Sequence, residues 1–352
     1  MHIENLSYKG KEEPFLKIES EPIVVVCAAD DKYAMPLAVT VRSALANLKK
    51  NWKILLFIID GGIKKRNKRR ILKTLSIDNC EVQFIPKPDN FAKSLEEAYR
   101  YTVTEGQAKN YISIAQYYRL FIAELLPDQA KKAIYLDCDL IVKEDLSQLW
   151  QIDLGENYVF AAQDTWVHSV SAHNGLLNYQ ELGIASDAKY FNSGVLVINV
   201  EKWRAEKVSA RAIDYLNHNK EHMIYGDQDI LNALFTGQWG ELDPRWNATS
   251  RIYEYSSWKE SPYQEHVYNN LIHNDFYIIH FISGEKPWNS RDVPLKEHFF
   301  HYVDMTSWSG WRFTFWQELW QKLVYKFRKA VSIIKARMNN RVSARINKTI
   351  LL

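Results

Sequence analysis

The chain has 352 residues, of which 47% are hydrophobic and 25% charged, so its composition is that of an ordinary globular protein and excludes a disordered or fibrous one. Its net charge of +3 is too small for a dedicated nucleic-acid-binding protein. The three cysteines have no metal-type spacing, and the N-terminus lacks the basic start and apolar core of a signal peptide. No apolar stretch approaches the ~18–20 residues of a membrane span, so we expect a reduced, cytoplasmic protein.

Strand and helix patterns alternate along the first half of the chain. Residues 1–20 are polar and are expected to form an extension. Strands are then predicted at 23–28, 53–59, 81–85 and 134–136, and helices at 35–48, 64–75 and 112–126. This alternation is typical of a doubly wound parallel sheet. The second half contains predicted strands at 158–162, 194–199 and 276–281 and a helix at 229–235, with no internal repeat or low-complexity linker.

Two aspartates, Asp137 and Asp139, follow the buried strand pattern that ends at Leu136. Side chains two residues apart in an extended chain point to the same side. Both carboxylates therefore project from the carboxyl end of a strand, where open α/β sheets bind their ligands. Such oxygen ligands suit a Mg²⁺ or Mn²⁺ ion that also binds a diphosphate. Because Asp-x-Asp also occurs by chance in a chain of this length, the interpretation depends on other residues.

His280, at the end of the last predicted strand, is a candidate third ligand. Two carboxylates and one imidazole suit Mn²⁺ or Mg²⁺ better than Ca²⁺, although a lone histidine on a strand is more often a core residue with satisfied hydrogen bonds. Gly284 allows close approach of the backbone to a ligand, and Lys286 offers a cation for phosphate. Neither common glycine-rich phosphate loop occurs in the sequence, which disfavours nicotinamide dehydrogenases and P-loop enzymes.

Two further polar clusters have the amide and carboxylate groups that bind sugar hydroxyls. Asn192 lies in the run Phe191-Asn192-Ser193-Gly194, at the mouth of a predicted strand. Asp227, Gln228 and Asp229 precede a predicted helix. An N-terminal cap explains Asp229 equally well, but it leaves Asp227 and Gln228 without a role.

The end of the chain is basic and aromatic. Nine Lys and Arg, and no Asp or Glu, lie between Gln321 and Leu352, so the rest of the chain is acidic. Apolar residues at helical spacing from Phe315 to Phe327 form one face of a predicted helix. A tryptophan-rich face beside Lys and Arg is typical of a helix lying on an anionic membrane surface. The alternative is a C-terminal helix that packs on the body with solvated charges.

These motifs together resemble glycosyltransferase family 8, especially the bacterial α-galactosyl- and α-glucosyltransferases that extend lipopolysaccharide cores. The resemblance covers about 23–288 and includes the basic aromatic tail. The motifs that carry it, in chain order, are Ala28-Ala29-Asp30-Asp31, Arg119, Tyr135-Leu136-Asp137-Cys138-Asp139, Phe191-Asn192-Ser193-Gly194, Gly226-Asp227-Gln228-Asp229 and His280 with Lys286-Pro287-Trp288.

The resemblance implies an α/β protein of the GT-A type, with a Rossmann-like mixed sheet flanked by helices and a C-terminal amphipathic helical tail. It implies transfer of glucose or galactose from a UDP-sugar, with retention at the anomeric carbon. Mn²⁺ (or Mg²⁺) would be bound by Asp137, Asp139 and His280. The other implied roles are base binding by Ala28 and Asp30, phosphate binding by Gly284 and Lys286, donor-sugar binding by Arg119, Asn192, Asp227 and Gln228, and an acceptor-side position for Asp164.

Gln228 and Asp227 are the implied catalytic residues. The family places Gln228 nearest the anomeric carbon, yet an amide is a poor nucleophile, so we hypothesise same-face attack without a covalent intermediate. The chain departs from the family pattern at Ser283, where glycine is common, and at Lys32, where an amide that contacts the base is common.

The predicted organisation has three parts: an N-terminal extension (1–20), a transferase domain (21–300) and a tail that associates with the membrane (301–352). We expect a glycan or glycolipid acceptor, no nucleic-acid partner, and a location at the cytoplasmic face of the plasma membrane. Two alternatives remain: a soluble transferase with a protein or small-sugar acceptor, and a non-catalytic nucleotide-sugar sensor or scaffold. The basic run 64–70 is interpreted as the solvated face of a helix.

Overall fold

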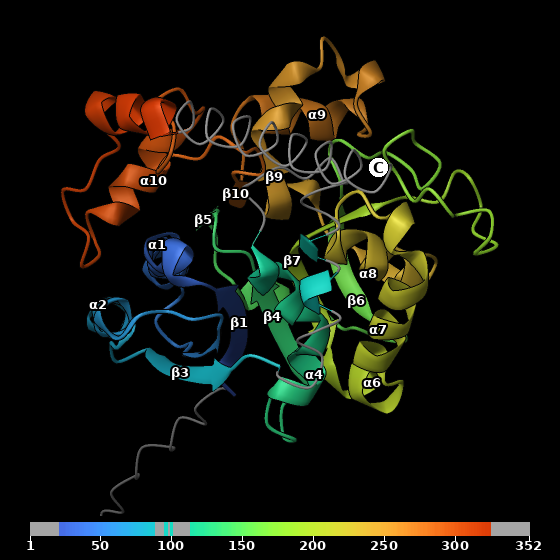
Figure 1. The fold of residues 1–352 in the computed structure, drawn as a ribbon, viewed down its shortest axis with the longest axis horizontal. Coiled ribbons are helices and arrows are strands. Elements are labelled where there is room, and N and C mark those ends of the chain that lie inside the picture. Colours follow the sequence, from blue (N-terminus) through green and yellow to red (C-terminus); the bar gives the residue numbers. More distant parts are fainter. Residues whose placement is uncertain (1–20, 89–94, 98, 101–112, 325–352) are drawn as a thin grey trace, which may run out of the picture.

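The computed structural model describes residues 21–88, 95–97, 99–100 and 113–324. The extension 1–20 and the tail beyond 324 lie outside the described residues. The centre is a seven-stranded sheet with the order β3-β2-β1-β4-β7-β6-β8 (Figure 1). Its strands are β1 (Ile23–Ala29), β2 (Ile54–Asp60), β3 (Cys80–Pro86), β4 (Lys132–Leu136), β6 (Val159–Gln163), β7 (Phe191–Asn199) and β8 (Trp239–Glu241).

Helices lie on both faces of this sheet (Figure 1). The α-helices described with full bounds are α1 (Ala34–Asn47), α2 (Lys65–Leu75), α4 (Ile122–Leu125), α5 (Ser147–Trp150), α6 (Val200–Ala205), α7 (Val208–Asn219), α8 (Asp227–Phe235), α9 (Glu265–Ile272) and α10 (Lys296–Val303). Short 3₁₀ segments connect them: η1 (Asp31–Tyr33), η2 (Ile114–Phe121), η3 (Lys220–His222), η4 (Pro244–Asn247), η5 (Ser250–Glu254) and η6 (Trp258–Glu260).

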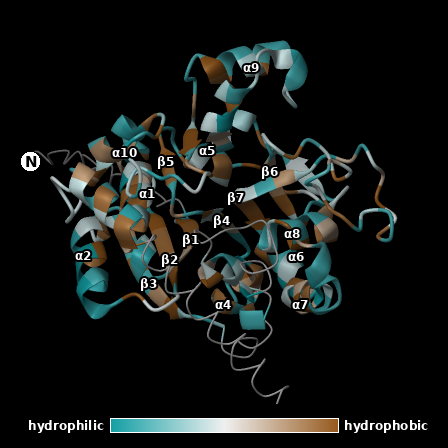
Figure 2. Cartoon of the chain, turned by 45° about the horizontal axis from the view of Figure 1, so that its top comes forward, coloured by the Kyte–Doolittle hydropathy of each residue, from teal (hydrophilic) through white to brown (hydrophobic). Residues whose placement is uncertain are grey.

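The side chains of β1 alternate between two hydrophobic cores. Ile23, Val25 and Cys27 pack in the core that includes buried residues of α1 and α10. Val24 and Val26 pack in the opposite core, which includes buried residues of α7 and α8. Because both faces of the sheet are covered at its centre, β1 is continuously apolar, whereas the edge strand β3 alternates apolar residues with Glu81 and Gln83. Figure 2 shows the hydrophobic strands in the interior, with α2 hydrophilic at the outside.

A second sheet of three short strands positions His280. β10 (Ile278–His280) pairs antiparallel with β5 (Leu140–Val142) and parallel with β9 (Ala248–Thr249). In this register His280 lies opposite Leu140. This pairing brings His280 close to Asp139, the residue before Leu140, although the two lie far apart in the sequence.

The second half of the sheet differs from the parallel arrangement that strand–helix alternation predicts. β7 runs antiparallel to both β4 and β6, so the sheet is mixed, as the resemblance implies. The antiparallel direction puts the beginning of β7 beside the end of β4, where the amide of Asp137 donates to the carbonyl of Gly194 at 2.8 Å. The polar run Phe191–Gly194 is therefore part of β7 and still lies at the carboxyl edge of the parallel strands.

The predicted helix at 112–126 is mostly a 3₁₀ segment. Residue 112 lies outside the described residues, η2 winds as a 3₁₀ helix, and α4 adds a single α-helical turn. The Ser113 hydroxyl caps η2 by accepting from the amide of Ala115 at 3.3 Å. The tight winding continues to Arg119, whose Nε donates to the carbonyl of Gln116 at 3.0 Å. Runs of 3₁₀ helix longer than three or four residues are uncommon.

The predicted boundary at residue 300 falls inside α10. The chain beyond this helix stays packed on the body, because Trp308 and Phe313 are both buried. Arg70 of α2 binds the carbonyl of Ser307 and stacks on Trp308. The exposed part of the C-terminal segment therefore begins at about residue 314.

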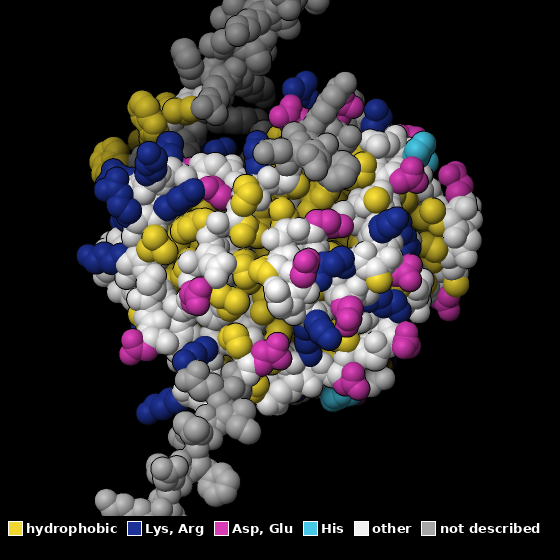
Figure 3. Space-filling model, turned by 90° about the horizontal axis from the view of Figure 1, so that it is seen from below, with side chains coloured by type: hydrophobic (Ala, Val, Ile, Leu, Met, Phe, Trp, Pro, Cys, Tyr) yellow, Lys and Arg dark blue, Asp and Glu magenta, His cyan; other side chains and the backbone are white. Residues whose placement is uncertain are grey.

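The basic run of α2 lies at the protein surface. Figure 3 shows Lys and Arg side chains gathered at the left edge of one face, where α2 lies, and interspersed charges elsewhere. The helix buries Ile71, Thr74 and Leu75 on its other side. Lys68 pairs with Asp60, so part of the run has partners within the body. No helix in the described part of the chain combines the length and apolar character that crossing a bilayer requires.

Candidate functional site

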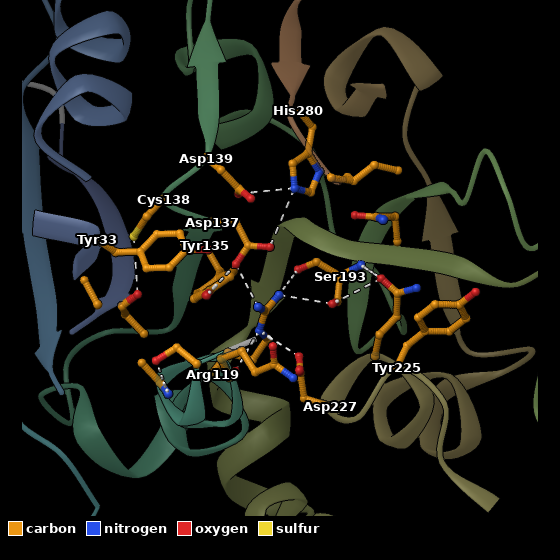
Figure 4. A pocket seen from close by; sticks show the side chains of 18 of the residues that line it. Tyr33, Arg119, Tyr135, Asp137, Cys138, Asp139, Ser193, Tyr225, Asp227 and His280 are labelled. Carbon is orange, nitrogen blue, oxygen red and sulfur yellow. Dashed lines mark hydrogen bonds and ion pairs between the residues drawn. The ribbon is translucent and has the colours of Figure 1, made fainter. Parts of the chain in front are cut away.

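A polar pocket opens at the carboxyl ends of β1 and β4 (Figure 4). Its walls come from β1, η2, the segment after β4, the start of β7, the start of α8 and the segment after β10. Ten of the residues assigned by the resemblance line it or belong to its metal-ligand cluster: Ala28, Asp30, Arg119, Asp137, Asp139, Asn192, Asp227, Gln228, His280 and Lys286. Asp164 also lines the pocket, whereas Gly284 is not among the lining residues.

Asp137, Asp139 and His280 bring one ligand atom each to a common position. These three atoms all lie within 4.8 Å of one another. His280 Nε2 is 3.3 Å from Asp139 Oδ1 and 3.9 Å from Asp137 Oδ2. Figure 4 shows the three side chains converging. Two carboxylates and an imidazole form a donor set that fits Mn²⁺ or Mg²⁺.

The orientation of the imidazole is fixed from behind. His280 Nδ1 lies 2.8 Å from Oδ1 of the buried Asn247. Because that oxygen can only accept, Nδ1 carries the proton, and the lone pair of Nε2 faces the two carboxylates as a third ligand for a cation. Asn247 in turn donates from Nδ2 to Asn192 Oδ1 at 2.8 Å. Outer partners of this kind set the tautomer of metal-binding histidines. The arrangement is therefore suited to a cation.

Gly194 is required for the histidine to approach the sheet. A Cβ at this position would lie 2.3 Å from His280 Cε1 and 3.0 Å from Asp137 Oδ2. No side chain can be accommodated at these separations without moving a proposed ligand. The glycine in the run Phe191–Gly194 thus makes room for the ligand cluster.

Lys286 reaches the same cluster from the segment after β10. Its buried Nζ lies 2.5 Å from Asp139 Oδ2 and also donates to the carbonyl of Phe281. Burial alone would raise the pKa of Asp139, but the positive charge of Lys286 outweighs that effect and holds the pKa below its usual range. Asp139 is therefore ionised at neutral pH.

Arg119 joins the metal-ligand cluster to the sugar side of the pocket. Its Nη2 lies 2.7 Å from Asp137 Oδ1, and its Nε lies 2.9 Å from Asp227 Oδ2. Nη1 donates to the carbonyl of Ser193 at 2.5 Å. The guanidinium also stacks on the ring of Tyr135, 4.4 Å from its centroid. One buried cation thus positions two of the predicted site residues.

Asp227 and Asp229 have different surroundings. Burial raises the pKa of Asp227 to about 7, and Arg119 opposes that rise. Burial also raises the pKa of Asp229, to about 6. Asp229 accepts from the amides of Ile224 and Tyr225 and from the hydroxyl of Tyr190, so it orders the approach to α8 and faces away from the pocket.

Asp164 accepts four hydrogen bonds that link it to the sugar-side residues. Oδ1 accepts from the amides of Trp166 at 2.7 Å and Val167 at 2.9 Å. Oδ2 accepts from Asn192 Nδ2 at 2.8 Å and from Gln228 Nε2 at 3.3 Å. The side-chain Oε1 of Gln228 accepts from the backbone amide of Ser193 at 3.0 Å. The side chains of Asn192, Gln228 and Asp164 are therefore held as one network.

Asp30 lies at the opposite end of the pocket, where β1 ends. Its Oδ1 accepts from the amides of Lys32 and Tyr33, and its Oδ2 accepts from the Ser113 hydroxyl at 2.9 Å. Ala28 lines the pocket beside it. The Gly284 carbonyl accepts from Asn289 Nδ2 at 2.9 Å, so this glycine shapes the turn that carries Lys286.

Several residues that line the pocket or lie behind it could not be predicted from the sequence. Asn247 carries only an apparent glycosylation signal in the sequence, and its role becomes visible only because η4 passes behind His280. Tyr33, Trp166, Tyr225 and Arg251 also line the pocket. Tyr225 directly precedes the polar run Gly226–Asp229. The other three belong to no recognisable motif, so the sequence contains no signal that assigns them to this site.

The pattern that defines glycosyl transferase family 8 matches residues 24–292. The chain belongs to this family. General stress protein A of Bacillus subtilis is 34% identical over 295 residues, covering 83% of this chain and 96% of that protein. The lipopolysaccharide glucosyltransferase WaaO of Escherichia coli is 33% identical over 205 residues, 56% of each chain.

The fold agrees with that of a solved family member. The crystal structure of the galactosyltransferase LgtC in complex with donor and acceptor sugar analogues superposes with a TM-score of 0.66, at 29% identity, over 81% of this chain and 96% of LgtC. The predicted family and the predicted GT-A-type mixed sheet are both confirmed. The polar pocket and the candidate metal cluster of this family 8 glycosyltransferase lie at the carboxyl edge of the sheet, where open α/β sheets bind their ligands.

Proposed function

We propose that this glycosyltransferase moves glucose or galactose from a UDP-sugar to a glycan or glycolipid, such as a lipopolysaccharide core, with retention at the anomeric carbon. The observation that carries the proposal is the convergence of Asp137, Asp139 and His280 within 4.8 Å beside a buried network of amides and carboxylates. The relatives WaaO and LgtC, named as sugar transferases, support it. A Mn²⁺ or Mg²⁺ ion at this cluster would supply positive charge that stabilises a departing diphosphate.

The chain's own residues then have distinct roles. Lys286 and the turn at Gly284 bind phosphate, and Ala28 and Asp30 contact the base. Arg119, Asn192 and Asp227 hold the donor sugar, Gln228 lies nearest the anomeric carbon, and Asp164 faces the acceptor. The buried network leaves these groups little freedom, so they orient the sugar at low entropic cost. The water-poor surroundings also strengthen electrostatic interactions with the leaving group.

We propose same-face attack as the route to retention. The bond between the anomeric carbon and the phosphate oxygen breaks, and UDP leaves with the electron pair. The acceptor oxygen bonds to the same carbon from the same side, and its proton passes to the leaving phosphate. Gln228 and Asp227 stabilise the positive charge that develops on the sugar. A glycosyl adduct trapped on Asp227 and detected by mass spectrometry would instead show two successive displacements.

Release of UDP in the absence of acceptor tests donor and metal together. The wild-type protein is assayed with a panel of UDP-sugars and Mn²⁺, with and without chelator, against Asp139→Asn, which keeps a hydrogen-bond partner for Lys286. We expect turnover of one sugar, lost with chelator and reduced at least 100-fold in the variant. Asp187→Asn, at an exposed position, is the control. Absence of both turnover and Mn²⁺-dependent nucleotide binding would favour the sensor or scaffold alternative.

We also propose that the C-terminal segment lies on an anionic membrane surface at the cytoplasmic face. The supporting observation is that residues 315–324 are helical and expose their aromatic side chains. Trp316 is 73% exposed and Trp320 is 68% exposed. Exposed tryptophans beside basic residues are typical of interfacial helices. A soluble transferase would have no need of this exposed apolar surface.

A further inference from the structure

One cation that lines the pocket has no role in the proposed donor site. Three Lys or Arg side chains lie among the described residues that line the pocket. Arg119 and Lys286 pair closely with buried carboxylates. Arg251 of η5 has only a 3.4 Å contact with the exposed Glu254. Its charge is therefore much less compensated than that of the other two.

The side chain of Arg251 is held by a contact on the flat face of its guanidinium group rather than by hydrogen bonds at the edge of that group. Its guanidinium stacks over the ring of Trp166, 4.3 Å from the centroid. Stacking on an aromatic face leaves the in-plane N–H groups of arginine free to donate, and these suit a carboxylate or phosphate. The arginine side chain is 29% exposed, so a ligand in the pocket can reach it. Holding the side chain in advance lowers the entropic cost of binding.

The position of Arg251 is on the acceptor side. Trp166 donates its amide to Asp164 Oδ1, and the Asp164 carboxylate already accepts four hydrogen bonds. The negative charge of Asp164 is thus stabilised by hydrogen-bond donors of the protein. It therefore compensates the positive charge of Arg251 less than a carboxylate without such bonds would. The metal-ligand cluster, in contrast, is formed by the segment after β4 and by the end of β10.

Tyr225 adds a hydrogen-bond donor to the same corner. Asn174 Nδ2 donates to its hydroxyl oxygen at 3.0 Å, so the phenolic proton can point to a ligand. Burial raises the pKa of Tyr225, and the charge of Arg251 opposes that rise, which is consistent with their proximity. The charge of Arg251 also opposes the rise that burial causes in the pKa of Tyr255. The hydroxyl of Tyr255, however, donates to the Thr165 carbonyl at 2.5 Å, so its proton is already used.

We infer that the acceptor of this enzyme carries an anionic group, a phosphate or a carboxylate, which Arg251 binds while Trp166 packs against the sugar. The inference rests on the proposed function, because it names the acceptor class of the same pocket. Arg251 then determines acceptor specificity, since a neutral sugar would leave its guanidinium without a charged partner.

Equilibrium binding tests this inference without requiring turnover. Calorimetry measures the affinity for methyl glucoside, methyl glucoside 6-phosphate and methyl glucuronide, each with saturating UDP and Mn²⁺ so that the diphosphate site is filled. We expect at least one anionic sugar to bind 10-fold or more tightly than the neutral one. The two anionic ligands distinguish phosphate from carboxylate. Arg251→Gln should abolish the preference and Arg251→Lys should retain part of it.

The control is Arg69→Gln on α2, a surface arginine outside the pocket, which should keep the full preference. Equal affinity for neutral and anionic sugars, or a preference that survives in Arg251→Gln, would overturn the inference. Donor turnover by the wild-type protein is measured separately. If turnover occurs and the preference is absent, the inference fails alone. If the preference is present and turnover is absent, the proposed function fails alone.

Discussion

Asp227 is a buried carboxyl group close to the Arg119 guanidinium, and the two effects of this position oppose each other. Burial disfavours the carboxylate, whereas the cation favours it. The outcome is a pKa raised to about 7, well above that of an unfolded aspartate. The native state therefore binds a proton that the unfolded chain has released, between about pH 4 and 7.

This difference between the pKa values of Asp227 in the native and unfolded states predicts that the free energy of unfolding depends on pH. As pH rises from about 4 to 7, the native state of the wild type is destabilised relative to the unfolded state, and Asp227→Asn removes that loss. We expect the variant to gain up to about 1.4 kcal/mol per pH unit over the wild type in this window, and nothing more above it. The measurement is the free energy of urea unfolding of the metal-free protein from pH 4.5 to 8.

Comparing the two proteins isolates Asp227. His168 and His298, whose pKa values burial lowers, contribute the opposite slope but do so in both proteins. Asp187→Asn, at an exposed site, should show no pH-dependent difference from the wild type. A constant difference between Asp227→Asn and the wild type across the window would show that the pKa of Asp227 is not raised.

Residue types at short spacing predicted the candidate metal ligands and the polar clusters, whereas Ala28, Asp30, Arg119 and Asp164 were implied by the resemblance to family 8. Asp137 and Asp139 lie on one side of an extended chain, and their role could be proposed from strand geometry alone. The sequence gives no comparable signal for Asn247 or Arg251, because each acts through a contact with a residue 33 or more positions away. Such contacts depend on how η4 and η5 pass the sheet, and no local pattern encodes that path.

At the scale of elements, apolar strand patterns were predicted more reliably than their direction. The strands β1, β2 and β3 lie where their β-branched runs predict them. β7 is equally apolar in either direction, so its antiparallel course could not be derived from its own residues. Its direction is set by the connections and by pairing on both edges. The packed chain also continues past residue 300, because Trp308 and Phe313 are buried.

The contact between α2 and the chain after α10 predicts the effect of a single substitution. Arg70 donates to the Ser307 carbonyl at 2.7 Å and stacks 4.2 Å from the Trp308 ring centroid. Removing a charged hydrogen bond and a cation–π contact by Arg70→Ala should lower the free energy of unfolding by about 1–3 kcal/mol. Urea denaturation measures the change.

The neighbouring Arg69 provides the matched control for this element. It lies on the same helix and is exposed, so Arg69→Ala should change stability by no more than about 0.5 kcal/mol. Equal losses in the two variants would mean that helix propensity or surface charge, and not the α2 contact, accounts for the effect.

At the scale of the whole molecule, a packed body is followed near residue 314 by an exposed helical segment. This segment touches the body through Arg291, which stacks over Phe315 and pairs with Glu318. The body ends with Phe313 buried, and the next helical residues expose Phe315, Trp316 and Trp320. Removing residues 315–352 therefore takes away exposed apolar surface and all nine Lys and Arg of the segment 321–352 without opening either core of the sheet. A truncation at Trp308 would not be equivalent, because it would also remove the partner of Arg70.

This separation predicts that membrane binding and donor binding can be lost independently. The protein lacking residues 315–352 should no longer sediment with vesicles containing phosphatidylglycerol, while its affinity for UDP in Mn²⁺ stays within twofold of the full-length value. In the full-length protein, Trp316→Ala with Trp320→Ala should weaken sedimentation about 10-fold or more, because interfacial binding scales with buried apolar area. High salt should weaken it further, since screening reduces attraction to anionic lipid. Vesicles of neutral phosphatidylcholine are the control. If the full-length protein ignores anionic vesicles, the membrane proposal is wrong, and the exposed aromatic face must meet another partner.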